Sequence, residues 1–316
     1  MKYQILKLLE SEDFISGEKL AKEFGISRTA IWKHIKNLKE NGYKIESVKN
    51  KGYRLVSRPD ILLPEEIMSK LNTKSIGDKI HYLKTVDSTN AYAKRLIEKG
   101  ACDGTIIVSE IQTNGRGRMQ RSWYSPEGGL WFSLILYPNI PPSSGMIITM
   151  AASLAVADGI KNITDIESRV KWPNDLLIDG KKVCGILTEL DAEMDKINYM
   201  IIGIGVNVNN TIKNDLRNSA TNLMQKTKNR ISLVKLLQSI LKNFDNYYTQ
   251  LKAGEYTKIR SLWLSNSNII GKEISVKTKH NKIEGIVTSL EEDGCLLIKT
   301  PEGNKRIISG DVIYHQ

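Results

Sequence analysis

The feature that most constrains the fold is a pair of short amphipathic segments near the N-terminus, separated by a glycine. In residues 17–40, "GEKLAKEFGISRTAIWKHIKNLKE", apolar side chains recur at helical spacing on both sides of Gly25. Gly25 is suited to end the first helix and Ser27 to cap the second. Two helices joined by so short a turn have the spacing of a helix-turn-helix, so we expect a small helical unit at this end of the chain.

The same end of the chain has the highest density of positive charge. The formal net charge is +11 at pH 7, and residues 1–60 hold 13 Lys and Arg against 8 Asp and Glu. A two-stranded wing is predicted at residues 43–55, and side chains on the second helix and the wing could reach phosphates and base edges of a DNA major groove. These candidate DNA-binding residues are Ser27, Arg28, Thr29, Trp32, Lys33, Lys36, Lys49 and Lys51, with Arg54 also on the wing. The alternative is a basic helical domain that binds another protein.

Length and composition limit the remaining possibilities. At 316 residues the chain is too long for one ordinary core, and Pro59 and Pro64 bracket a plausible linker. We expect three domains, at residues 1–60, 61–267 and 268–316. The apolar run 146–160 is too short for a membrane span, and the start of the chain does not resemble a secretory signal, so we expect a cytoplasmic protein with no membrane partner. Three scattered cysteines and four scattered histidines indicate neither a disulfide framework nor a metal site.

Strand-like and helix-like segments are mixed in the middle of the chain. Residues 105–111 and 129–137 are strand-like, and the helical patterns lie at 146–163 and 231–251. Residues 175–190 predict a hairpin that turns at Asp179-Gly180. The regular alternation of a Rossmann fold is missing, so the predicted class is α+β, with helices packed on a mixed or antiparallel sheet.

The last segment has a different pattern. From residue 268 onward, short alternating strands are separated by turn signals at His280-Asn281, Asp293-Gly294 and Glu302-Gly303. Several short strands in so small a segment favour a β-barrel of SH3-like size.

Four short polar or glycine-containing stretches accompany the apolar segments of the middle domain. They are "DSTN" at 87–90, "QTNGRGRMQRSW" at 112–123, "KWPND" at 171–175 and "GIGVNVN" at 203–209. The second stretch concentrates three arginines beside Gly115 and Gly117, which would let the backbone come close to an anion that the arginines bind. No Walker motif occurs, and "GIGVN" lacks the third glycine of a Rossmann fingerprint, so any nucleotide is bound in another way. Taken singly, each stretch could instead be a helix cap, a turn or a surface loop.

In order and spacing, these four stretches resemble the active-site motifs of biotin protein ligases, and the helix-turn-helix resembles that of their bifunctional repressor branch. The resemblance covers essentially the whole chain. It implies a winged helix-turn-helix, a central catalytic domain similar to class II aminoacyl-tRNA synthetases and an SH3-like C-terminal β-barrel. It implies an enzyme that makes biotinyl-5′-adenylate from biotin and ATP with Mg²⁺, and that passes biotin to a lysine of a biotin carboxyl carrier domain. It also implies a homodimer that binds operator DNA of biotin genes, with the adenylate as corepressor.

The resemblance also implies roles for individual residues, carried over by their match to the motifs. The implied biotin-binding residues are Ser88, Thr89, Asn90, Gln112, Gly115, Arg116 and Lys182. The implied nucleotide-binding residues are Arg118, Arg121, Trp123, Asn174 and Asn207. The implied catalytic residues are Arg118, Lys182 and Asp175, where Asp175 orients Lys182 or helps to hold a metal. Lys182 is chosen by matching "KKVCGIL" to the family's K-x-x-G-I-L, and Lys181 would then point to the other face of the strand.

One position departs from the family pattern. The loop of the family continues with an Arg-Gly pair, and Met119-Gln120 stand there in this chain. The loss of that glycine bears on the flexibility of the loop and on how well the adenylate is retained. Two other interpretations stay open: a lipoate-type ligase with similar adenylate chemistry, and a repressor whose central domain only senses a small molecule.

Overall fold

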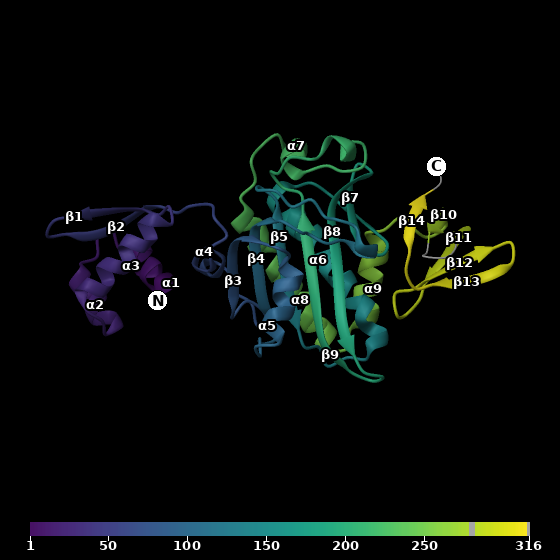
Figure 1. Ribbon diagram of the computed structural model, residues 1–316, viewed down its shortest axis with the longest axis horizontal. Helices are drawn as coiled ribbons and strands as arrows, with labels where there is room; N and C mark the ends of the chain where they lie inside the picture. The colour runs from purple at the N-terminus through teal and green to yellow at the C-terminus, as the bar shows by residue number, and fades with distance from the viewer. Residues whose placement is uncertain (278–281, 315–316) are drawn as a thin grey trace. The chain divides into compact units, whose positions relative to one another are not determined.

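The computed structural model describes residues 1–277 and 282–314 of the chain (Figure 1). The chain divides into two compact units, Met1–Lys70 and Leu71–Gln316. The turn predicted at His280-Asn281 lies outside the described residues.

The first unit is a helix-turn-helix followed by a two-stranded wing. Its elements are α1 (Lys2–Ser11), α2 (Gly17–Phe24), α3 (Arg28–Glu40) and the antiparallel strands β1 (Lys44–Val48) and β2 (Gly52–Ser57). Gly25 ends α2 in the left-handed conformation, with φ 64°. The Ser27 side chain caps α3 by accepting a hydrogen bond from the backbone N of Ala30 at 3.1 Å. The predicted helix-turn-helix is therefore confirmed, including both caps.

The first unit continues past residue 60. α4 (Pro64–Ser69) packs on α1, and a buried polar cluster fixes it there. Glu66 accepts a hydrogen bond from the Tyr43 hydroxyl at 2.6 Å and forms an ion pair with Arg58 at 2.5 Å, and Arg58 also pairs with Glu10 at 2.8 Å. Burial, together with the neighbouring Glu66 carboxylate, raises the pKa of Tyr43 well above its ordinary value. Pro59 therefore precedes α4 and Pro64 is its first residue. The first unit extends to Lys70.

We expect Arg58→Ala to lower the free energy of unfolding by about 3 kcal/mol, because it removes the guanidinium that pairs with the buried Glu66 carboxylate. Arg54→Ala is the control, since the pairs of Arg54 with Glu46 and Asp13 are exposed and their loss should have a much smaller effect. Urea unfolding of the full-length variants, followed by circular dichroism, measures both. Equal losses would show that the cluster does not hold α4.

A seven-stranded sheet forms the centre of the second unit. The strands lie in the order β3-β4-β5-β9-β8-β7-β6, with β3 and β4 parallel and the other neighbours antiparallel. Their bounds are β3 (Ile80–Val86), β4 (Thr105–Gln112), β5 (Leu130–Leu136), β6 (Arg169–Lys171), β7 (Asp175–Ile178), β8 (Lys181–Ala192) and β9 (Ile197–Val206). The predicted mixed sheet is confirmed, and Asp179 and Gly180, at φ 50° and 73°, form the predicted turn between β7 and β8.

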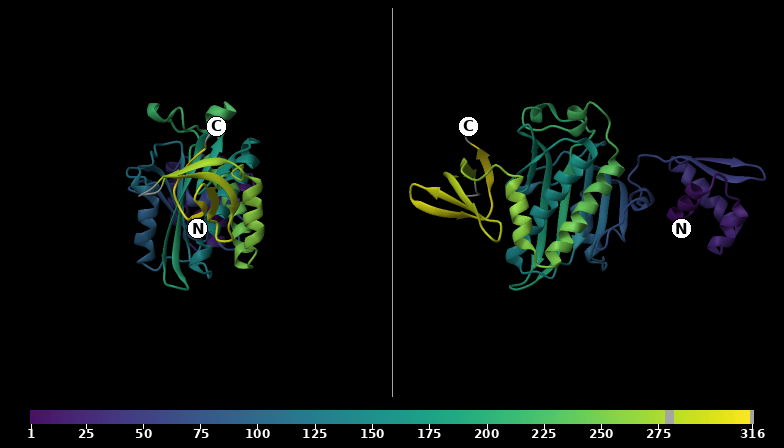
Figure 2. Two further views of the ribbon diagram at one scale, coloured as in Figure 1. Left: turned by 90° about the vertical axis from the view of Figure 1, so that its right-hand side faces the viewer. Right: turned by 180° about the vertical axis from the view of Figure 1, so that it is seen from behind.

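Helices cover both faces of this sheet (Figure 2). α5 (Thr89–Ile97) packs on one face, and α6 (Gly145–Thr164) packs on the other. α8 (Leu233–Lys252) and α9 (Tyr256–Ser265) pack against α6. α6 is long and apolar enough to span a membrane, but most of its residues are buried inside the protein, as expected for a core helix. The short elements are η1 (Arg118–Gln120), η2 (Pro142–Ser144), η3 (Asn214–Leu216) and α7 (Leu223–Thr227).

The end of the chain forms a second, fully antiparallel sheet with the order β13-β12-β11-β10-β14. Its strands are β10 (Glu273–Lys277), β11 (Lys282–Leu290), β12 (Leu296–Thr300), β13 (Gly303–Ile307) and β14 (Asp311–Tyr314). The predicted turns at 293–294 and 302–303 join β11 to β12 and β12 to β13. The indole N–H of Trp172 donates to the carbonyl of Gly294 at 3.0 Å, which fastens this sheet beside the central one.

Candidate active site

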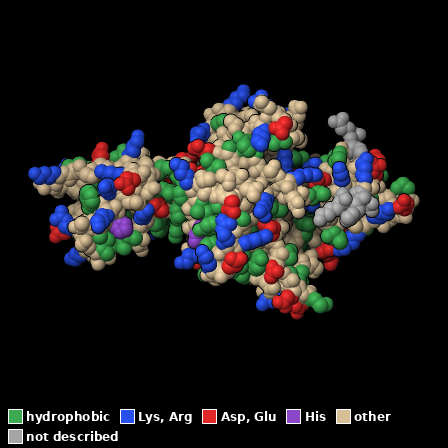
Figure 3. All heavy atoms as spheres, viewed as in Figure 1, with side chains coloured by type: hydrophobic (Ala, Val, Ile, Leu, Met, Phe, Trp, Pro, Cys, Tyr) green, Lys and Arg blue, Asp and Glu red, His purple; other side chains and the backbone are tan. Residues whose placement is uncertain are grey.

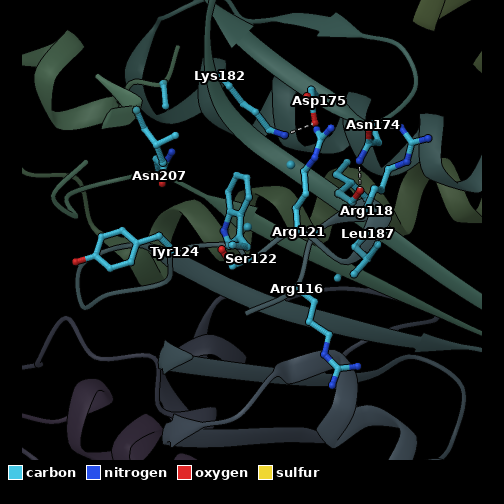
Figure 4. A pocket seen from close by; sticks show the side chains of 18 of the residues that line it. Arg116, Arg118, Arg121, Ser122, Tyr124, Asn174, Asp175, Lys182, Leu187 and Asn207 are labelled. Carbon is cyan, nitrogen blue, oxygen red and sulfur yellow. Dashed lines mark hydrogen bonds and ion pairs between the residues drawn. The ribbon is translucent and has the colours of Figure 1, made fainter. Parts of the chain in front are cut away.

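Polar side chains from β4, α5, β7 and β8, from the arginine-rich loop and from Asn207 after β9 line a cavity of about 620 Å³, part of which is shown in Figure 4. The predicted biotin-binding, nucleotide-binding and catalytic residues that line it are Ser88, Thr89, Asn90, Gln112, Arg116, Arg118, Arg121, Trp123, Asn174, Asp175, Lys182 and Asn207. Gly115 is the one predicted residue of this set that is not part of the lining. Six cationic side chains and two carboxylates of the described residues line the cavity, so it is suited to a ligand with several negative charges.

One end of the cavity is an array of uncharged hydrogen-bonding groups. The hydroxyl of Ser88 caps α5, where it accepts a hydrogen bond from the backbone N of Ala91 at 3.5 Å. The backbone N of Thr89 donates to Gln112 Oε1 at 2.8 Å, and Gln112 Nε2 donates to Ser125 Oγ at 2.8 Å. These bonds join the start of α5 to the end of β4 and to the loop that follows, so the array is held by the protein itself.

The arginine-rich loop, residues 113–125, forms a small hairpin. Gly117 N donates to Arg121 O at 2.7 Å, and Trp123 N donates to Gly115 O at 2.8 Å. Met119 and Gln120 form its tip, with φ 53° and 58°. Gln120 therefore adopts a left-handed conformation that costs a residue with a Cβ roughly 1–2 kcal/mol, at the position where the family pattern has glycine.

Of the two glycines in this loop, only Gly115 makes a close approach to its own chain. A Cβ added to Gly115 would lie 2.4 Å from the carbonyl oxygen of Trp123 and 2.7 Å from Ser125 Oγ. A Cβ at Gly117 would meet nothing closer than 3.5 Å. Gly115 thus allows the two ends of the loop to close on each other.

The indole of Trp123 lies against the backbone of two strands of the central sheet. Gly185 of β8 and Gly205 of β9 are cross-strand partners, and Cβ atoms added to them would lie 3.0 and 2.4 Å from the indole. Trp131 packs against the same ring edge to face, with centroids 6.4 Å apart. Two neighbouring glycines therefore create the space that positions this indole at the cavity.

Lys182 enters the cavity, and Lys181 does not. The Lys182 ammonium pairs with Asp175 Oδ1 at 2.6 Å and lies 5.1 Å from the centroid of the Trp123 ring (Figure 4). Lys181 Nζ instead donates to the backbone carbonyl of Arg217 at 3.0 Å, outside the lining of the cavity. The alternation of side chains along β8 separates the two lysines.

The other cations of the cavity differ in their partners. Arg118 donates to Asn174 Oδ1 at 3.2 Å and to the carbonyl of Gly310 at 3.4 Å, and burial lowers its pKa. Burial also lowers the pKa of Lys171, at the end of β6. Arg121 pairs with Asp311, the first residue of β14. Arg116 points away from this group in Figure 4.

Asn207 follows β9 and is fixed through its backbone and its side-chain oxygen. Its backbone N donates to the carbonyl of Val183 at 2.8 Å, and its Oδ1 accepts from Asn210 Nδ2 at 3.1 Å. Within the described part of the chain, its amide nitrogen has no protein acceptor, so it is free to donate into the cavity.

The first unit exposes the residues predicted to bind DNA. On α3 and just before it, Ser27, Arg28, Thr29, Trp32, Lys33 and Lys36 are solvent-exposed, as are Lys49 and Lys51 on the wing. Basic side chains project from the visible face of this unit and from the tip of the wing (Figure 3). Arg54 differs from the others, because its guanidinium is bound by Glu46 and Asp13.

Comparison with known proteins agrees with this arrangement along the whole chain. Residues 2–54 match the model of an HTH domain, residues 82–207 that of the biotin/lipoate A/B protein ligase family, and residues 269–314 that of the biotin protein ligase C terminal domain. The chain is 41% identical to the bifunctional ligase/repressor BirA of Bacillus subtilis over 95% of this chain and 94% of that one. The chain belongs to the biotin protein ligase family.

Two further comparisons show that the similarity covers most of the chain in sequence and in structure. The bifunctional ligase/repressor BirA of Escherichia coli is 28% identical over 98% of this chain and 95% of its own. The structure of the biotin protein ligase from Aquifex aeolicus in complex with biotin and ATP matches 76% of this chain and 99% of that chain, at 33% identity and a TM-score of 0.66. The helix-turn-helix is thus a feature that this ligase shares with the bifunctional relatives.

The sequence analysis gave no role to some residues that line the cavity. Lys171 and Tyr124 lie inside or beside quoted motifs but had no predicted role, and Asp311 comes from the distant β14. The segment 212–220 also lines the cavity, and its Lys213 lies 4.5 Å from the ring centroid of Tyr124. The only signal in that segment is a pair of apolar residues, Ile212 and Leu216, in a polar stretch.

We expect Gly115→Ala to impair the closed form of the loop, because its Cβ would overlap the backbone of Trp123. Biotin-dependent activity should fall by an order of magnitude or more, and limited proteolysis should cut the loop faster. Gly117→Ala is the matched control in the same loop and should leave both properties within about twofold, since its Cβ has ordinary contacts. Similar losses in the two variants would contradict the assigned role of Gly115.

Proposed function

We propose that this chain is a biotin–[acetyl-CoA-carboxylase] ligase and a repressor of biotin genes in the cytoplasm. It activates biotin with ATP to biotinyl-5′-AMP and transfers biotin to a specific lysine of a biotin carboxyl carrier domain. The observation that supports this best is a single cavity that joins an uncharged hydrogen-bonding array to an excess of cations, in a chain whose relatives are ligases.

The first reaction needs charge neutralisation more than proton transfer. The carboxylate of biotin is ionised at neutral pH, because an ordinary carboxylic acid has a pKa near 4, so it attacks the α-phosphorus of ATP without a general base. Two anions must meet, and fixed cations stabilise the charge that develops between them. Lys182 is the proposed bridging cation, held by Asp175, and Arg118 with Arg121 are proposed to bind phosphates.

The remaining residues are assigned to the two substrates. Biotin is proposed to contact Ser88, Thr89, Asn90, Gln112, Gly115, Arg116 and Lys182. The nucleotide is proposed to contact Arg118, Arg121, Trp123, Asn174 and Asn207. Arg121 can serve this purpose once phosphate replaces Asp311 as its partner, and the free amide nitrogen of Asn207 is available to an acceptor on the base.

The cavity fits a magnesium ion that arrives with ATP. Mg²⁺ is usually held by one or two carboxylates together with substrate phosphates, and Asp175 and Asp311 are the carboxylates that line this cavity among the described residues. The ion would supply further neutralisation of the triphosphate. The described residues contain no cluster of three or more His, Cys, Asp or Glu side chains that would hold a metal without ATP.

The second reaction and the regulatory activity complete the proposal. The acceptor lysine must attack as a neutral amine, although an ordinary lysine has a pKa near 10.4. The winged helix is proposed to bind operator DNA, with α3 in the major groove, the adenylate as corepressor and a homodimer as the DNA-binding form. We propose functional domains at residues 1–60, 61–267 and 268–316, where α4 is a connecting helix that packs on the first unit. The central domain is proposed to be similar to class II aminoacyl-tRNA synthetases, and the C-terminal domain to be an SH3-like barrel.

Exchange of labelled pyrophosphate into ATP tests the enzymatic part of this proposal. Only an enzyme that forms an adenylate exchanges the label, so a repressor that merely senses biotin gives no exchange. Exchange that depends on biotin, and not on lipoate, supports the biotin ligase. Exchange that depends on lipoate instead would identify a lipoate-type ligase.

We expect Lys182→Ala to lower the rate of adenylation by on the order of 10²-fold or more, as the loss of one preorganised donor typically does. Lys181→Ala should have little effect on this rate, because its ammonium lies outside the cavity. Lys182→Arg should recover only part of the activity, since a planar guanidinium distributes the same charge differently. Single-turnover adenylation measures all three, and an equal or larger loss at Lys181 would transfer the bridging role to that residue.

Deletion of residues 1–70 should abolish binding to operator DNA and leave adenylation in place. The candidate DNA-binding residues all lie in the deleted unit, and every residue that lines the cavity lies beyond Lys70. Electrophoretic mobility shift and pyrophosphate exchange of the same preparation separate the two activities. A truncated protein that still shifts operator DNA, or that loses adenylation completely, would contradict this division.

A further inference from the structure

Two residues outside every predicted motif contact the groups assigned to biotin. Ser133 on β5 is fully buried, and its Oγ lies 2.7 Å from Thr89 Oγ1 and 2.6 Å from Asn90 Oδ1. Glu189 on β8 accepts a hydrogen bond from Asn90 Nδ2 at 2.8 Å through one oxygen and from Lys94 Nζ of α5 at 2.7 Å through the other. Both residues therefore touch Asn90, and neither lines the cavity.

The contacts of Asn90 fix the orientation of its amide. Its two N–H groups are taken by Glu189 Oε2 and, at 3.4 Å, by the carbonyl of Leu187. Its oxygen accepts from Ser133 and packs on the backbone of Gly203, where an added Cβ would lie only 2.2 Å away. A flipped amide would turn its oxygen toward the Glu189 carboxylate and its N–H groups toward Gly203. Asn90 can therefore offer a ligand only the remaining lone pair of its oxygen.

The hydrogen-bond partners of Gln112 likewise fix which end of its amide is the oxygen and which is the nitrogen. Its Oε1 accepts from the backbone N of Thr89 at 2.8 Å, which fixes the oxygen at this end of the amide. One proton of Nε2 is donated to Ser125 Oγ. Gln112 keeps one N–H that can be donated to a ligand, so this end of the cavity combines a donor at Gln112 with an acceptor at Asn90.

We propose that Glu189 and Ser133 are positioning residues that set this polarity through Asn90 and Thr89, so that the cavity selects a flat group with both a carbonyl and an N–H. The ureido group of biotin has this composition, and the inference thus rests on the proposed function. Neither residue is a catalytic residue, because each acts through a neighbour that touches the ligand.

The charge of Glu189 is maintained by its surroundings. Burial alone would raise the pKa of this carboxyl, but the hydrogen bonds from Lys94 and Asn90 outweigh burial and lower it. The carboxylate is therefore ionised at neutral pH and remains an acceptor for the Asn90 amide. Lys94 and Glu189 come from α5 and β8, so an ion pair at the surface also links the helix that carries Asn90 to the sheet.

Biotin binding by full-length variants tests this inference, with calorimetry for Kd and pyrophosphate exchange for KM and kcat. Glu189→Ala should raise Kd and KM for biotin at least about tenfold, the loss expected for one hydrogen bond to a charged group. KM for ATP, and kcat at saturating biotin, should stay within about twofold of wild type. Glu189→Gln keeps an oxygen acceptor for Asn90 and should recover most of the affinity. Ser133→Ala should also raise KM for biotin, without a change in KM for ATP.

Two controls separate positioning from a general electrostatic or structural effect. Glu167→Ala breaks an exposed ion pair with Lys161, remote from the cavity lining, and should leave biotin binding unchanged. Arg116 also lowers the pKa of Glu189, so Glu189→Ala could weaken biotin binding through Arg116 instead of Asn90. The double variant Glu189→Ala with Asn90→Ala separates the two routes. If Glu189 acts through Asn90, Glu189→Ala adds less than about twofold to the loss already caused by Asn90→Ala.

The outcomes distinguish this inference from the function on which it rests. If the wild-type protein binds no biotin, the proposed function fails and the inference fails with it. If the wild type binds biotin and Glu189→Ala binds it equally well, only the positioning role is overturned. Additive losses in the Glu189 and Asn90 double variant, or equal changes in KM for biotin and ATP, would overturn it as well.

Discussion

The contact between the Trp123 indole and the glycine backbone of β8 and β9 organises the site. Because Gly185 and Gly205 face each other on β8 and β9, the sheet offers Trp123 a surface without side chains. The hydrogen bond from Trp123 N to the carbonyl of Gly115 then closes the loop that carries the arginines. The two glycines of the sheet thus help to determine where the arginine-rich loop places its cations.

The C-terminal sheet completes the site from a distant part of the chain. β14 begins at Asp311, which pairs with Arg121, and the preceding carbonyl of Gly310 accepts from Arg118. The bond between Trp172 and Gly294 fastens the same sheet beside the "KWPND" segment. Two loop arginines are therefore bound by C-terminal groups. The proposed phosphate contacts of these arginines would replace those partners, which would couple nucleotide binding to the contacts of the C-terminal sheet.

Local signals were the most informative part of the sequence. Gly25 and Ser27 predicted the helix-turn-helix, and Asp179-Gly180 predicted the β7–β8 hairpin, because caps and tight turns depend on residues adjacent in the chain. Long-range contacts left no such signal. Asp311 reaches Arg121 only through the packing of two sheets, and Ser133 and Glu189 look like ordinary strand residues until their neighbours on α5 are known.

The linker and the roles of the site residues could be predicted only in part. Pro59 and Pro64 bracket residues 60–63, which lie in no helix or strand, but the short helix α4 that begins at Pro64 was not predicted. The motifs indicated which residues line the cavity, since their side chains share one end of the sheet. The roles of those residues with biotin and ATP stay predictions, because side-chain identity and position do not by themselves specify which ligand atom each one meets.

The left-handed tip at Met119 and Gln120 bears on the proposed function through the lifetime of the adenylate. An acyl adenylate survives only while water is kept away from its mixed anhydride, so opening of a loop that covers it would compete with transfer to the acceptor. Residues with a Cβ restrict the open loop to fewer backbone conformations than glycine does, which reduces the entropy lost on closing. The same Cβ atoms strain the closed tip, because both residues are at positive φ. In the proposed reaction, the balance of these two effects at the tip would set how often the loop opens, and therefore how long the adenylate is retained before transfer.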